Sequence, residues 1–184
     1  TLLLPLMVIF PQLLKKFSAP QLIAAATVVS AAGYVMNFFA GDNVPMLLGA
    51  GVLSAMAMLP ISYLGFMIIM DLASYNEYIG MPRMEASIGA IFFGFGEQLG
   101  QGVGAALTGF MLSAAGYIAA EGEAVVAQPD GVIAMIRTLH SFVPALLMVL
   151  IGIMAVMLSK LSKQMPQMEK EIAERKIEAP ADNK

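Results

Sequence analysis

Long, largely apolar stretches separated by short polar segments run along the whole chain. Each complete stretch is about 20 residues or longer, which is the length of a helix that crosses a bilayer. An open sheet leaves backbone groups unpaired in lipid, and the alternating pattern of a barrel strand is missing. The pattern therefore predicts an all-α, polytopic transmembrane helical bundle. The expected bundle covers residues 1–159, with spans over 1–14 (truncated), 21–40, 44–70, 86–118 and 131–158, and a tail over 160–184.

The composition agrees with a lipid environment and excludes several classes of function. Hydrophobic residues make up 59% of the chain and charged residues 12%, whereas soluble domains have about 45–50% and about 25%. A net charge of −3 gives no basic surface for nucleic acid. With no cysteine and one histidine, no thiolate site and no dedicated transition-metal site are expected. No phosphate-binding loop, dinucleotide fingerprint or nucleophile motif is present, so we expect neither an enzyme nor a bound cofactor.

The loops divide into a basic set and an acidic set. Five helices place alternate loops on the same side of a bilayer. The basic set contains Lys15, Lys16, Arg83, Lys160 and Lys163, and the acidic set contains Asp42, Glu121, Glu123 and Asp130. By the positive-inside rule the basic set is cytoplasmic, which predicts a multi-pass protein of the cell membrane with a cytoplasmic C-terminus. Because Thr1 lies inside an apolar run, we expect the chain to be the C-terminal part of a longer protein.

Three polar side chains interrupt the span over 86–118: Glu97, Gln98 and Gln101. Glu97 lies about a dozen residues into the span, near its middle, where a carboxylate costs about 2.5–3.5 kcal/mol on insertion scales. Two interpretations are open. The three side chains form one wall of a polar solute cavity, with Glu97 contacting a cation or a proton, or Glu97 is a carboxyl group hydrogen-bonded to a neighbouring helix. Because charge inside a membrane is usually functional, we favour the cavity.

Further candidates for the cavity lie on two other spans. Pro60 removes a backbone hydrogen bond, and a bend there could aim Ser62 and Tyr63 at the cavity. Arg137 and His140 are three residues apart and share one face of the last span. Arg137 either extends to the outer surface or pairs with an acidic group across the cavity. His140 either titrates or makes a hydrogen bond within the packing.

Small residues recur at every fourth position beside Glu97. Gly96, Gly100, Gly104 and Thr108 therefore lie on one face of a helix. In membranes such a stripe lets a second helix approach closely, so we predict helix packing rather than contact with a ligand.

Polar side chains gather in residues 71–85, DLASYNEYIGMPRME. Their spacing, D-x-x-x-Y-x-E-Y-x-G-x-x-R-x-E, resembles the cytoplasmic loop between helices ten and eleven of the glycoside–pentoside–hexuronide:cation symporters. These are the melibiose-permease-like branch of the major facilitator superfamily. PQLLKKFSAPQL is similar to that family's connection between helices eight and nine. QLGQGVGAALTGFMLSAAGY is similar to its eleventh helix and FVPALLMVLIGIM to its twelfth.

The resemblance implies a secondary transporter in which two six-helix bundles rock around a central site. The chain would be part of the C-terminal bundle and would pair with an N-terminal six-helix bundle. The implied function is symport of a small polar solute, a sugar or glycoside, with Na⁺, Li⁺ or H⁺, and the N-terminal bundle would supply most cation ligands. The family often has Asp at the position of Ser74 and Lys at that of Gln98, so the charge of the cavity differs here. Alternatives are a carrier of lipid or another organic solute, or a membrane structural subunit that transports nothing.

The loop over 71–85 also has a physical role that does not depend on the resemblance. Its charged residues can form an ion-pair network that holds one state of the bundle and breaks in the other. We predict that this gating loop uses Asp71, Tyr75, Glu77, Arg83 and Glu85. The tail beyond residue 160 has Glu-to-Lys and Glu-to-Arg pairs at helical spacing, such as Glu171 with Arg175, and predicts a solvated helix.

Overall fold

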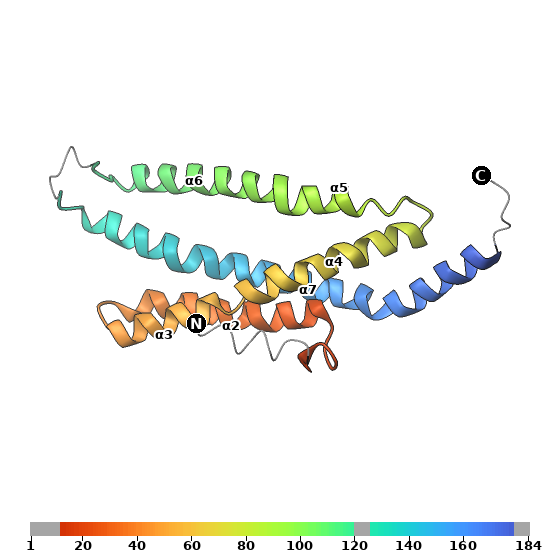
Figure 1. Ribbon diagram of the computed structural model, residues 1–184. Coiled ribbons are helices and arrows are strands. Elements are labelled where there is room, and N and C mark those ends of the chain that lie inside the picture. Colours follow the sequence, from red (N-terminus) through yellow and green to blue (C-terminus); the bar gives the residue numbers. More distant parts are fainter. Residues whose placement is uncertain (1–11, 120–125, 179–184) are drawn as a thin grey trace.

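The computed structural model describes residues 12–119 and 126–178, and within them all regular structure is helical. The predicted truncated span thus lies mostly outside the described residues. The helices form the transmembrane-type bundle that the sequence predicts, drawn in Figure 1. In chain order they are α2 (Ala19–Ala40), α3 (Val44–Ala55), α4 (Met58–Tyr78), α5 (Glu85–Gly89), the π-helix η1 (Ala90–Phe95), α6 (Gly96–Ala114) and α7 (Asp130–Glu178).

Local side-chain chemistry explains where the first helices begin and end. The Ser18 backbone N–H donates to Gln21 Oε1 over 3.0 Å at the start of α2, and Asn43 Oδ1 accepts from the Met46 backbone N–H over 3.1 Å at the start of α3. Both bonds satisfy donors that a helix leaves free in its first turn. Gly41 ends α2 with φ of +54°, a conformation that favours glycine. The sequence GDN therefore makes the tight turn between α2 and α3.

The predicted span over 44–70 consists of two helices in the structure. The helix breaks at Met56 and Ala57, and Pro60 then lies in the first turn of α4. Proline has no N–H to donate to the carbonyl four residues earlier, so the break falls just before it. The second helix also continues past residue 70 to Tyr78. Asp71 and Glu77 therefore lie on α4 and not in the predicted loop.

The region predicted as the span over 86–118 is one helical rod made of α5, η1 and α6 (Figure 1). It begins after Met84, which has φ of +55°, and it ends at Ala114, before Gly116 with φ of +83°. The π-helical segment lies directly before Glu97. An inserted residue in a helix shifts the direction of every side chain that follows, and such segments are frequent at functional sites.

Helix α7 contains 49 residues. At about 1.5 Å per residue it is roughly 74 Å long, more than twice the roughly 30 Å hydrocarbon core of a bilayer. It includes the predicted span over 131–158 and continues without interruption through the predicted tail to Glu178. Pro144 and Pro166 lie inside it, and its C-terminal part bends toward the end of α4 (Figure 1).

Close contacts between helices hold α2, α3, α4 and α7 together, and we call these four helices the body. At Gly33 of α2, an added Cβ would overlap the backbone of Leu53 and Ser54 in α3, and the Ser30 hydroxyl donates to the Ser54 carbonyl beside it. At Gly152 of α7, an added Cβ would lie 2.8 Å from Thr27 Oγ1 of α2. Small residues therefore set the helix spacing, as is usual in membrane proteins. The apolar core of the body includes Ala19, Ile23, Leu64, Ile68 and Ala155.

The loops lie at two ends of the structure. The turn before α2, the loop after α4 and the C-terminal part of α7 lie at one end, which we call the Arg83 end. The turn at Asp42 and the start of α7 lie at the other (Figure 1). This division agrees with the predicted basic loop set and with Asp42 and Asp130 of the acidic set, while Glu121 and Glu123 lie outside the described residues. Within the described residues, three helical stretches are long and apolar enough to cross a membrane: Ala19–Ala40, Val44–Tyr78 and Asp130–Ile177.

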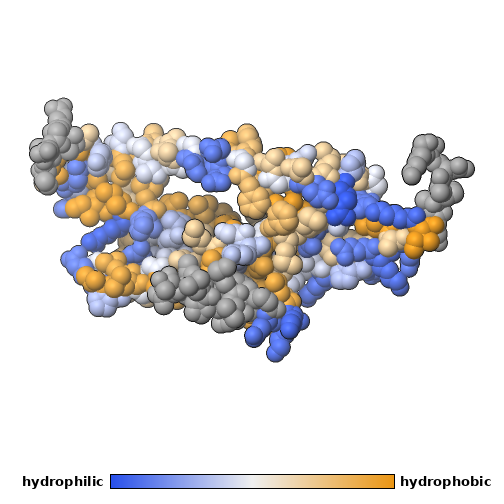
Figure 2. Space-filling view, viewed as in Figure 1, coloured by the Kyte–Doolittle hydropathy of each residue, from blue (hydrophilic) through white to orange (hydrophobic). Residues whose placement is uncertain are grey.

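The rod of α5, η1 and α6, by contrast, has little contact with the body. None of its residues is buried, and Figure 2 shows a gap beneath this helix where the body does not reach it. Gly65 of α4 is one point of approach, because a Cβ added there would lie 3.8 Å from the rings of Phe92 and Phe93. The rod therefore packs on α4 near the Arg83 end and meets the body again at its far end, where a Cβ added at Gly131 of α7 would lie 3.9 Å from the Ala115 carbonyl oxygen.

Candidate functional site

The polar patch on α6 consists of Glu97, Gln98 and Gln101, and all three residues are exposed. Gln101 Nε2 donates to Glu97 Oε1 over 3.2 Å, which holds the carboxylate and the amide on one face. Glu97 makes no ion pair with any of the described residues. The patch therefore presents a carboxylate and two amides, with most of their hydrogen-bonding groups free for a ligand or for a segment beyond the described residues.

Ser62 and Tyr63 lie at about the same level as this patch. Gly65 on α4 faces Phe92 and Phe93, and α4 runs toward the Arg83 end while α5 to α6 runs away from it (Figure 1). One turn back from Gly65 is Ser62, and about one turn on from Phe93 is Glu97. Both Ser62 and Tyr63 are exposed. Their part in a cavity with the patch stays a prediction.

Arg137 and His140 lie at a separate place. They line a cavity of about 150 Å³ near the Asp42 end, together with Asn37 of α2 and Ser141 of α7. No residue of α6 lines this cavity. The structure therefore does not bring Arg137 and His140 together with Glu97, although all of them were candidates for one cavity.

The glycine stripe on α6 has no partner helix among the described residues. A Cβ added at Gly100 or Gly104 would meet nothing within 4 Å, and one at Gly96 would meet only the Ile91 carbonyl oxygen of its own rod, at 3.1 Å. The predicted packing against another helix therefore requires a helix outside the described residues. Close packing by small residues does occur in this chain, but at Gly33 and Gly152.

Ion pairs connect four segments at the Arg83 end, namely α4, the loop after it, α5 and α7, and we call this group the Arg83 cluster. Arg83 Nη1 lies 2.9 Å from Glu77 Oε2, and Arg83 Nε lies 2.5 Å from Glu85 Oε1. The other oxygen of Glu77 lies 2.6 Å from Lys176 Nζ of α7. Glu77 thus links the loop after α4 to the end of α7, and three of the five predicted gating residues take part.

The other two predicted gating residues do not join the Arg83 cluster. Asp71 Oδ2 accepts a hydrogen bond from the Ser162 hydroxyl over 3.1 Å, which ties α4 to α7 one turn and a half before Glu77. Tyr75 is half-buried on α4, and its side chain makes no hydrogen bond within the described part of the chain. Between α4 and α7 lies a cavity of about 290 Å³, lined by residues that include Asp71, Glu77, Arg83 and Lys176.

Arg83 and Glu85 stabilise each other's charged form. The hydrogen bond from Arg83 lowers the pKa of the Glu85 carboxyl below its ordinary value. Hydrogen bonds to Glu85 and then to Glu77 raise the pKa of the Arg83 guanidinium. These groups are partly exposed to solvent, and ion pairs at a solvated surface stabilise a fold only weakly. The cluster is thus formed at neutral pH and can be broken at small cost.

The tail of α7 packs on the end of α4, and this contact corrects the prediction of a merely solvated helix. Met165 and Ile172 are buried. Arg175 Nη1 donates to the Tyr78 carbonyl over 2.9 Å, and Arg175 Cζ lies 5.1 Å from the Tyr78 ring centre. The predicted pair of Glu171 with Arg175 is present at 3.8 Å. The missed signal is a stripe of apolar residues at helical spacing within the charged tail: Leu161, Met165, Met168 and Ile172.

Comparisons with known proteins agree with a transporter. The pattern of the family described as "MFS/sugar transport protein" matches residues 1–162, which is most of the chain. Neither the curated proteins nor the solved structures gave a match. The family consists of transporters rather than enzymes, and the bundle has helices that can cross a membrane. The chain therefore belongs to the MFS/sugar transport family of the major facilitator superfamily.

Proposed function

We propose that this chain takes part in cation-coupled symport of a sugar or glycoside-like solute by alternating access. The observation that carries the proposal is the pair of Glu97 and Gln101, a carboxylate and an amide held 3.2 Å apart on an exposed face of α6. These groups accept from and donate to the hydroxyl groups of a sugar. The family match to sugar transport supports the same class of solute.

The coupling ion proposed is Na⁺, Li⁺ or H⁺. Glu97 is the only carboxylate on α6, so this helix supplies one anionic oxygen donor and cannot by itself surround a metal ion. A preceding six-helix bundle of the full-length protein would supply the remaining ligands. This arrangement is the one implied by the resemblance to the glycoside–pentoside–hexuronide:cation symporters, to which we assign the chain within its superfamily.

The Arg83 cluster would act as the gate of the alternating-access cycle. Its ion pairs join the loop after α4 to the rod through Arg83 and Glu85, and join α4 to α7 through Glu77 and Lys176. Weak ion pairs at a solvated surface can bias two states of similar free energy without locking either. In this proposal the Arg83 end faces the cytoplasm of the cell, because loop cations favour that side.

Uptake by the reconstituted full-length protein tests the proposal. Vesicles holding the protein would be given radiolabelled glycosides under an imposed gradient of Na⁺, Li⁺ or H⁺. We expect accumulation of at least one glycoside that requires one of these gradients and that disappears when the gradient is collapsed. Accumulation of a lipid analogue instead, or no uptake of any solute while the protein is folded, would overturn it in favour of a lipid carrier or a structural subunit.

A further inference from the structure

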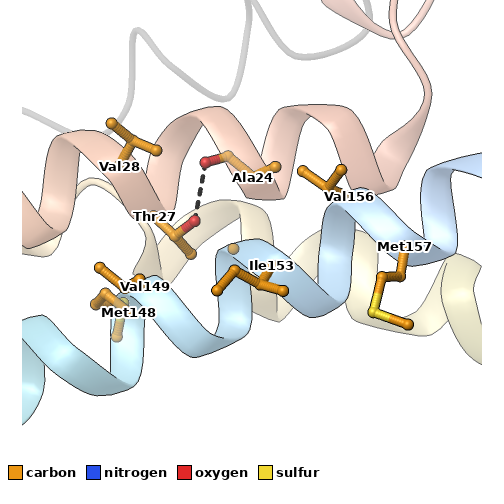
Figure 3. A pocket seen from close by; sticks show the side chains of 9 residues that line it. Ala24, Thr27, Val28, Met148, Val149, Ile153, Val156 and Met157 are labelled. Atoms are coloured by element: carbon orange, nitrogen blue, oxygen red, sulfur yellow. Dashed lines mark hydrogen bonds between the residues drawn. The ribbon is translucent and has the colours of Figure 1, made fainter.

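An apolar groove of about 350 Å³ runs between α2 and α7 (Figure 3). Ala24 and Val28 of α2 and Val149, Ile153 and Val156 of α7 are among the residues that line it. Figure 3 shows the two helices side by side with these side chains along the groove between them.

The floor of the groove offers nothing polar to a ligand. The Thr27 hydroxyl lies there opposite Gly152, but it donates to the Ala24 carbonyl over 2.8 Å, drawn as a dashed line in Figure 3. No residue of α4, η1 or α6 lines the groove. It is therefore separate from the Glu97 patch, and its occupant must be hydrocarbon, because water in it would have no partner.

Two pairs of lysines lie just beyond one end of the groove. The residues of α7 that line it recur as Val149, Ile153 and Val156, and the next positions on the same face are Lys160 and Lys163. On α2 the groove ends near Ala24, and Lys15 and Lys16 precede this helix. Leu14 and Leu158 pack against one common core cluster, which places the two pairs of lysines at the same level.

These lysines are available to an anion. Lys15, Lys16, Lys160 and Lys163 are exposed, and none forms an ion pair with another of the residues that the structure describes. Lys170 and Lys176, further along α7, are instead paired with Glu174 and Glu77.

The dimensions of the groove match one leaflet of a bilayer. It extends from Met148 to Met157 on α7, which corresponds to about 14 Å along the helix. One leaflet accounts for about half of the roughly 30 Å hydrocarbon core. A chain that fills the groove therefore has its polar end at the surface of the leaflet, where the lysines lie.

From this placement we propose that the α2–α7 groove binds one anionic phospholipid, with an acyl chain against Val149, Ile153 and Val156 and the phosphate held by Lys160 and Lys163, together with Lys15 or Lys16. Basic side chains between membrane helices at the bilayer surface are the usual way to recognise an anionic headgroup. The proposal depends on α2 and α7 crossing the membrane and does not depend on which solute is transported.

Retention of lipid by the purified full-length protein tests the site. Native mass spectrometry with phosphatidylglycerol and phosphatidylcholine of equal chain length should show preferential retention of phosphatidylglycerol. Each lysine near an anionic surface contributes about fivefold to binding. Lys160→Gln with Lys163→Gln should therefore reduce phosphatidylglycerol retention roughly 25-fold, whereas Lys170→Gln, which removes one positive charge outside the groove, should leave it unchanged.

A second pair of variants tests the acyl-chain half of the site. Val156→Phe narrows the groove and should reduce retention of both lipids, while Met154→Phe, at an exposed residue that does not line the groove, should not. Glycerol phosphate should fail to displace the lipid, since a free phosphate uses only the lysines.

Equal retention of the two lipids, or no effect of the lysine or Val156 variants in protein of unchanged melting temperature, would overturn the proposal. A change of oligomeric mass in Val156→Phe, without loss of lipid, would assign the groove to a second copy.

Discussion

The body and the rod of α5, η1 and α6 contain similar glycines and carboxylates, but these residues make different contacts in the two regions. In the body, Gly33 and Gly152 lie against neighbouring helices, and Glu77 and Asp71 bind partners on α7 or in the adjoining loop. On the rod, a Cβ added at Gly100 or Gly104 would meet no described atom within 4 Å, and the one described partner of Glu97 is Gln101, one turn away.

This difference distinguishes residues that stabilise the fold from residues that interact with a partner outside the body. A glycine or carboxylate that finds its partner inside the described structure contributes to the fold. Polar groups in a membrane are costly unless they are satisfied, so an unpaired Glu97 at mid-length of a helix implies a partner outside this body. The proposed solute, the proposed coupling ion and the proposed N-terminal bundle would be such partners.

The largest expected effect is that of Glu97→Gln on transport. Replacement removes a charge but keeps the size and the hydrogen bond to Gln101. A hydrogen bond to a charged group contributes about 1.5–3 kcal/mol, so uptake should fall about 10- to 100-fold. The melting temperature should not change, because no ion pair with a described residue is lost. Normal uptake in this variant, or a large loss of stability, would show that Glu97 belongs with the structural residues of the body.

The next effect compares one glycine of the body with one glycine of the rod. Gly33→Ala places a Cβ against the Leu53 and Ser54 backbone and should destabilise the protein by about 1–3 kcal/mol. Gly100→Ala has open space and a better helix former, and should cost nothing. Thermal unfolding monitored by protease resistance measures both. An equal loss in the two variants would mean that the rod is packed as closely as the body in the full-length protein.

A smaller effect is expected for Arg83→Ala. The variant removes both ion pairs of Arg83, with Glu77 and Glu85, but leaves Glu77 with Lys176. The melting temperature should fall only slightly, because ion pairs at a solvated surface are weak. If the Arg83 cluster is a gate, transport should fall more than solute binding does, and comparison of uptake with equilibrium binding separates the two. An equal loss of both would argue against gating.

The smallest effect is that of pH on the pair of Arg83 and Glu85. Because the pKa of Glu85 is lowered in the folded protein, the pair is fully formed above the ordinary value of about 4.5 and is lost as the pH falls through the lowered value. Hydrogen exchange of residues 79–85, corrected for intrinsic rates, should therefore increase below about pH 4.5. Glu85→Gln should show the higher exchange at every pH, and a pH response that persists in this variant would assign it to another group.

The sequence predicts the class of this fold well but not how its helices meet. The helices at 19–40 and 130–158 follow from apolar length alone, and the break before Pro60 follows from the missing N–H of proline. The close contact at Gly33 could not be predicted, because the other glycines in the chain have the same local pattern. Likewise Arg137 and His140 share a helical face, yet the cavity they line belongs to α2 and α7 and not to Glu97.

The sequence by itself determined that the chain is a membrane bundle with basic loops at one end and a polar patch on one helix. These features depend on the free energy of transferring each residue into lipid, which is a property of the residue and its neighbours along the chain. Only the tertiary structure decided that the C-terminal part of α7 packs against α4. The contacts of Ser162 with Asp71 and of Arg175 with Tyr78 join residues 91 and 97 positions apart, and such contacts depend on the direction of helices that local sequence does not fix.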